Sequence, residues 1–92
     1  MGCKDEELSL LHHAFSTATA AAEKALKDAA WFRTQATEIL ETMTGTEPGS
    51  EKYKLLDKAF KTAMEGAECS VKVANTFADE AMFIVTQIEK LS

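Results

Sequence analysis

Two adjacent histidines near the start of the chain, His12 and His13, are the residues with the most obvious metal-binding chemistry. Metal sites on helices use ligands spaced three or four residues apart. Adjacent residues of a helix point about 100° apart, so this pair cannot face one ion together. No His, Cys, Asp or Glu lies three or four positions from either histidine. We therefore expect no metal site within one chain, and only ligation across a dimer would create one.

Acidic and thiol side chains offer no better catalytic arrangement. Two pairs of carboxylates have the spacing of one helix face, Glu38 with Glu41 and Glu65 with Glu68. Neither pair has a histidine partner, so we expect both to be solvated charges. Cys69 has Lys72 three residues further on, which would activate a thiol nucleophile only weakly. The sequence therefore predicts a protein that is not an enzyme and that needs no cofactor.

The composition limits the class of partner. The 92 residues carry 10 Lys and Arg against 15 Asp and Glu, a net charge of −5. Nucleic-acid binding needs a basic surface that neutralises phosphates, so we expect none. No apolar run approaches the roughly 18 residues that span a bilayer. With no apolar leader and with two cysteines far apart in the predicted fold, we expect a cytoplasmic protein with free thiols.

An internal repeat determines the predicted architecture. A shift of 45 residues aligns 8–43 with 53–88, and 13 of these 36 positions hold identical residues. Between the repeats lies a glycine and proline cluster that is typical of a turn, with Gly45 at the expected helix C-terminus. We predict one domain over 1–92, with a helix over about 6–44 capped by Asp5, a turn over 45–50, and a helix over about 51–91 capped by Ser50.

Both predicted helices carry apolar residues in a heptad pattern, the signature of a coiled-coil seam. Positions a and d are apolar throughout, apart from Ser70. The largest side chains of this seam are Phe15, Phe32, Ile39, Phe60, Phe77 and Ile84. A short turn makes the helices antiparallel neighbours, and Phe32 is then expected to pack on Ala67. The predicted fold class is therefore all-α, a long antiparallel helical hairpin that arose by internal duplication.

More apolar side chains lie outside the seam than a hairpin needs. Those expected at an interface are Leu26, Trp31, Met64, Val71, Met82, Phe83 and Val85. Soluble proteins rarely expose an apolar patch larger than a few hundred Å². Two hairpins packed face to face would bury these side chains, so we expect a homodimer that forms a four-helix bundle. The alternatives are a chain folded back into a compact three- or four-helix monomer, and an obligate helical partner protein.

Two aromatic residues point to the kind of function. Trp31 and Phe83 align with Thr76 and Glu38 of the other repeat, so the duplicated seam requires neither aromatic. Large aromatic side chains outside a seam are typical of interface anchors. We expect a non-enzymatic helical interaction module of assembly, adaptor or chaperone-like regulatory type. The alternative is a binder of a small apolar or lipidic ligand between bundle helices.

The first three residues, Met1-Gly2-Cys3, resemble an acylation signal. A Gly2 exposed by removal of methionine can be myristoylated, with palmitoylation of Cys3 as a second anchor. The signal prefers serine or threonine at position 6, where this chain has Glu6, and no basic cluster follows. We expect an unmodified N-terminus and no membrane partner.

Overall fold

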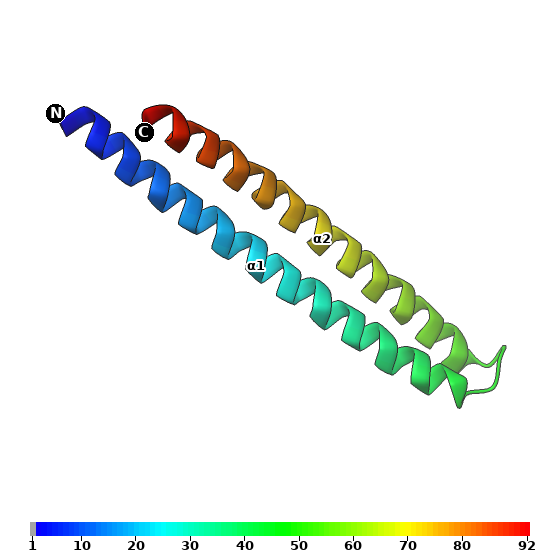
Figure 1. Cartoon of the computed structure of the whole chain (residues 1–92). Coiled ribbons are helices and arrows are strands. Elements are labelled where there is room, and N and C mark those ends of the chain that lie inside the picture. The colour runs from blue at the N-terminus through cyan, green and yellow to red at the C-terminus, as the bar shows by residue number, and fades with distance from the viewer. Residues whose placement is uncertain (1) are drawn as a thin grey trace. The chain divides into compact units, whose positions relative to one another are not determined.

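A computed structural model describes residues 2–92 and places them in two helices, α1 (Gly2–Thr44) and α2 (Glu51–Leu91), with no strand among these residues. The helices run in opposite directions (Figure 1), so the predicted all-α helical hairpin is confirmed. Met1, the first residue of the candidate acylation signal, lies outside the described residues. Neither helix contains a described stretch long and apolar enough to cross a membrane.

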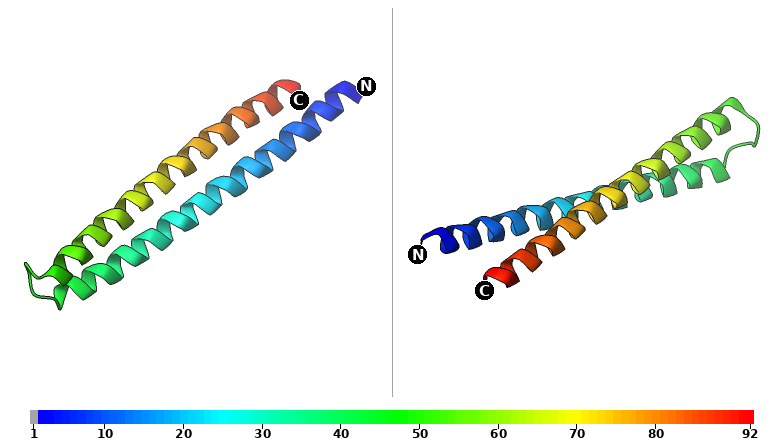
Figure 2. Two further views of the ribbon diagram at one scale, coloured as in Figure 1. Left: turned by 180° about the vertical axis from the view of Figure 1, so that it is seen from behind. Right: turned by 90° about the horizontal axis from the view of Figure 1, so that it is seen from above.

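The contacts within the chain form two compact units, which are described separately. The terminal unit consists of the α1 segment up to Ala25 and of Lys72–Ser92. The turn unit consists of Leu26–Val71. Within each unit an α1 segment and an α2 segment lie side by side and antiparallel, as the left view of Figure 2 shows. The single domain over 1–92 stays a prediction.

The start of α1 differs from the prediction. The helix begins at Gly2 rather than near residue 6, so the prediction of Asp5 as the N-cap is wrong. The physical reason is that no proline or β-branched residue before Leu8 opposes the helical backbone. Asp5 instead lies in the first turn, where its carboxylate is near the positive end of the helix dipole.

The turn between the helices is closed by local hydrogen bonds. Ser50 caps α2 as predicted, because its Oγ accepts a 3.1 Å hydrogen bond from the backbone N–H of Tyr53. On the other side of the turn, the N–H of Gly45 donates to the carbonyl of Thr42 at 3.2 Å. The left-handed backbone that often follows a helix is found at Gly49, with φ of 89°, and not at Gly45.

The core is built mainly from the smallest apolar side chain. The buried apolar residues all occupy a or d positions of the heptad, and they are Ala18, Ala25, Ala29, Ala36, Met43, Ala63, Ala67, Ala74, Ala81 and Ile84. Eight of these ten are alanine. In the terminal unit, Ala18, Ala81 and Ile84 form one cluster against which Leu11, Ala14 and Ile88 pack. The seam thus brings two backbones close together but encloses little apolar side-chain area.

Candidate interaction surface

The side chains predicted to lie at an interface are nearly all exposed. The exposed six are Leu26, Trp31, Met64, Met82, Phe83 and Val85, whereas Val71 is half-buried. The exposed fraction reaches 58% for Trp31, 64% for Phe83 and 69% for Met82. Further exposed apolar side chains extend the set, namely Leu10, Leu40, Leu55 and Val73. A large share of the apolar side-chain area therefore faces solvent in one hairpin.

The large side chains predicted for the seam are more buried than those predicted for the interface. Ile84 is buried, and Phe32, Ile39, Phe60 and Phe77 are half-buried. Phe15 is the exception, since it is 36% exposed although it occupies an a position. The phenylalanines therefore lie at the margins of the alanine core rather than inside it.

In the turn unit the exposed apolar side chains lie on two flanks of the hairpin. Leu26, Leu40 and Met64 occupy e positions, and we call them the aliphatic flank. Trp31 and Leu55 occupy c positions. On one helix, c is two residues from e and hence about 200° away around the axis. The two sets therefore face different directions, and a single flat partner surface cannot cover both.

A groove of about 450 Å³, open to solvent, lies on the c side of the turn unit. Its lining residues are Trp31, Phe32, Gln35, Leu55, Lys58, Ala59, Thr62 and Ala63. Large side chains at Trp31 and Leu55 thus stand beside the small side chains of Ala59 and Ala63. Among the lining residues, Lys58 alone carries a charge.

A glycine positions the aromatic residues of this groove. The ring of Phe32 lies against Gly66, where an added Cβ would be only 2.7 Å from Phe32 Cε1. Trp31 meets the ring of Phe32 edge-on, with centroids 5.1 Å apart and an interplanar angle of 76°. The structure thus places Phe32 against the residue that precedes Ala67. We call Gly66, Phe32 and Trp31 the aromatic stack.

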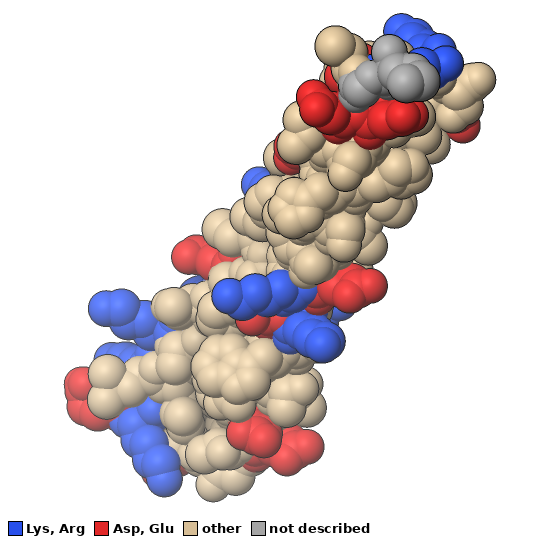
Figure 3. Space-filling view, turned by 90° about the vertical axis from the view of Figure 1, so that its left-hand side faces the viewer, with Lys and Arg blue, Asp and Glu red and all other residues tan. Residues whose placement is uncertain are grey.

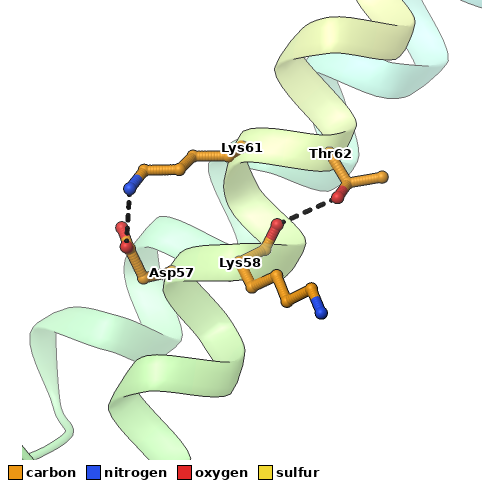
Figure 4. Close-up of polar contacts among 4 residues, drawn as sticks. All are labelled: Asp57, Lys58, Lys61 and Thr62. Carbon is orange, nitrogen blue, oxygen red and sulfur yellow. Dashed lines mark hydrogen bonds and ion pairs between the residues drawn. The ribbon is translucent and has the colours of Figure 1, made fainter.

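The hydroxyl of Thr62, one of the polar side chains at the groove, is satisfied within α2. Thr62 Oγ1 donates to the carbonyl of Lys58 at 3.0 Å, which leaves its methyl group available for apolar contact. Asp57 Oδ2 and Lys61 Nζ form an ion pair at 3.1 Å, and the ammonium of Lys58 extends away from that pair (Figure 4). The side chain of Lys58 is therefore free to meet an acidic group of a partner.

The terminal unit has a second open groove, of about 560 Å³. It is lined by Glu7, Leu10, Leu11, Gln87, Lys90 and Leu91. Here the charged lining residues are of opposite sign, and no aromatic side chain takes part. The face in Figure 3 likewise shows acidic and basic side chains interspersed among uncharged ones. On this face, basic side chains thus lie beside acidic ones.

The residues first considered for chemistry do not assemble into a site. His12 and His13 are exposed, and the thiols of Cys3 and Cys69 are free and exposed. Within residues 2–92, no three His, Cys, Asp or Glu side chains come together as metal ligands would. Comparisons with models of protein families, with curated proteins and with solved structures find no match. The exposed apolar flanks and the groove are the surface features on which a proposal of function can be based.

Proposed function

We propose that this protein is a non-enzymatic helical interaction module, of assembly, adaptor or chaperone-like regulatory type, that acts through its exposed apolar side chains. The observation that carries the proposal is the distribution of side-chain size: eight of the ten buried seam residues are alanine, while large apolar side chains such as Trp31, Met82 and Phe83 are exposed. Full burial of one such large side chain contributes about 1.5–3 kcal/mol, several times the contribution of a methyl group. A partner that covers them supplies the apolar contact that the hairpin lacks.

The accessible area supports self-association into a four-helix bundle. The chain exposes 6783 Å², whereas a folded monomer of 10.0 kDa typically exposes about 5,200 Å². The excess is about 1,500 Å² per chain by these figures. Obligate homodimers bury about 1,000–2,500 Å² on each subunit, so a second copy would cover an area of the right size. We further propose a cytoplasmic location, supported by the free thiols of Cys3 and Cys69.

The first test is the mass of the protein in solution, measured by light scattering across a dilution series. We expect about twice the 10.0 kDa of one chain, with dissociation only at high dilution. A mass of one chain at every concentration would contradict self-association. If that monomer bound a defined helical partner protein, the interaction module would act through a partner protein instead of a second copy.

The groove of the turn unit favours one second candidate, the binding of a small apolar or lipidic ligand. Its volume of about 450 Å³ lies within the range of ligand sites, and its lining is mainly apolar. Because the groove is open, a second hairpin would be needed to enclose the ligand. Titration with a fatty acid should then change the fluorescence of Trp31, the one tryptophan, in a saturable manner. An unchanged spectrum would rule this candidate out.

A further inference from the structure

The two flanks of the turn unit differ in where their large and small side chains lie, and this difference indicates what each flank can bind. On the aliphatic flank, large side chains occupy e positions directly beside the seam. At the groove, the large side chains of Trp31 and Leu55 at c stand beside Ala59 at g. Gly66, the next g position of α2, lies against the ring of Phe32. A hollow between large side chains is the kind of hole that accepts one projecting side chain from a neighbouring helix. We therefore expect the partner helix to insert one projecting apolar side chain into the groove.

The terminal unit exposes such a residue. Phe83 also occupies a c position of α2 and is 64% exposed. Its counterpart in the other repeat is Glu38, so packing of the seam does not require an aromatic side chain at this position. Phe83 is large enough to contribute a substantial part of an interface and is not used by the hairpin itself.

For the second copy we take the register in which the two α2 helices overlap over their full length. α2 runs from Glu51 to Leu91, and two copies laid antiparallel with full overlap pair residues whose numbers sum to 142. In this register, Ala59 of the groove faces Phe83 of the second copy. Two-fold symmetry repeats the contact, so that each copy provides one groove and one phenylalanine. A large side chain thus lies opposite a small one at both ends of the contact.

We propose that Phe83 of a second copy occupies the groove beside Trp31, in a two-fold symmetric contact between the α2 helices. The proposal rests on the self-association proposed above and names the surface that it uses. The excess exposed area of about 1,500 Å² per chain matches what a homodimer covers. The charges agree as well, since Glu80 of the second copy falls opposite Thr62, one helical turn from Lys58.

The first experiment compares two substitutions at adjacent positions. Phe83→Glu introduces a charge into the proposed contact, whereas Met82→Glu introduces the same charge at an equally exposed neighbour about 100° further around the helix. We expect Phe83→Glu to raise the dimer dissociation constant by at least ~30-fold, because each dimer loses an aromatic anchor at both ends of the contact. Met82→Glu should change it less than ~3-fold. Equal effects, or a larger effect of Met82→Glu, would overturn the proposal.

The second experiment uses a thiol that the chain already contains. In the proposed register, the two copies of Cys69 lie about 6 Å apart along the helices, on either side of the two-fold axis. In a Cys3→Ser variant, a bis-maleimide that spans about 8–10 Å, the spacing of packed helices, should join them into a covalent dimer. A dimer formed through the aliphatic flank would turn Cys69 away from the contact, and this reagent would leave it as single chains.

Self-association and the specific contact through Phe83 are contradicted by different results. A wild-type dimer that neither cross-links through Cys69 nor responds to Phe83→Glu would overturn this contact and leave self-association standing. A wild-type protein that is monomeric at every concentration would overturn both. Circular dichroism of the Phe83→Glu variant should show the helicity of the wild type, since Glu38 already occupies the corresponding position of the other repeat.

Discussion

The turn unit and the terminal unit are built from the same duplicated sequence and differ mainly outside the seam. Alanines that correspond through the repeat are buried in both, as Ala29 and Ala74 are. By contrast, Trp31 of the turn unit corresponds to Thr76, and Gly66 corresponds to Ala21. A feature present in both units is required to pack two helices together. A feature present in only one is not, and this marks Trp31 and Gly66 of the aromatic stack as the residues most available for function.

The largest loss of stability should come from substitutions of the buried alanines, which both units share. Ala29 and Ala74 are 1% and 3% exposed, so a leucine at either position has no space. We expect Ala29→Leu and Ala74→Leu each to lower the free energy of unfolding by about 2–3 kcal/mol through overpacking. Urea denaturation at one fixed protein concentration measures both. If only one of the two substitutions lowered the free energy of unfolding, the seam would not be equivalent in the two units.

The next effect concerns Gly66, where the units differ. Glycine in a helix interior is about 1 kcal/mol less favourable than alanine, yet an alanine Cβ here would meet the ring of Phe32. We expect Gly66→Ala to destabilise the protein by about 1 kcal/mol, because the overpacking outweighs the gain in helix propensity. In a Phe32→Ala background, the same substitution should stabilise it by about 1 kcal/mol.

A double-mutant cycle in urea gives the coupling of Gly66 and Phe32 directly, at about 2 kcal/mol from the two opposite effects. Ala21→Gly in the terminal unit is the matched control, and it should lose about 1 kcal/mol whether or not Phe77 is present. Stabilisation by Gly66→Ala in both backgrounds would show that Phe32 does not press on the glycine.

The sequence was sufficient for the seam because a heptad pattern has a direct physical meaning. Residues at a and d must meet the partner helix, and the buried residues occupy those positions without exception. The cap at Ser50 followed equally from local chemistry. The pattern did not reveal how deeply each residue lies, and so Phe15 was expected in the seam although it is partly exposed.

The aromatic stack could not be derived in the same way. Heptad positions placed Phe32 near Ala67 but did not show which backbone atoms its ring would touch. A signal was present, since an isolated glycine inside a helical pattern usually has a packing reason, and Gly66 is the only glycine between Gly49 and the end of the chain. The groove depends on the side-chain conformations of Trp31 and Leu55, which a periodic pattern does not specify.

The smallest expected effect compares the two helix starts, at residues that also correspond through the repeat. Ser50 accepts a hydrogen bond from the backbone N–H of Tyr53, whereas Asp5 lies inside the first turn of α1, where we expect its carboxylate to act through the helix dipole. We expect Ser50→Ala to lower the free energy of unfolding by about 1 kcal/mol. Asp5→Ala should lower it by less than half as much, and its effect should shrink at high salt because an exposed charge is screened. Denaturation at low and high ionic strength separates the two, and a salt-insensitive loss for Asp5→Ala would show that Asp5 acts through a hydrogen bond at the start of the helix.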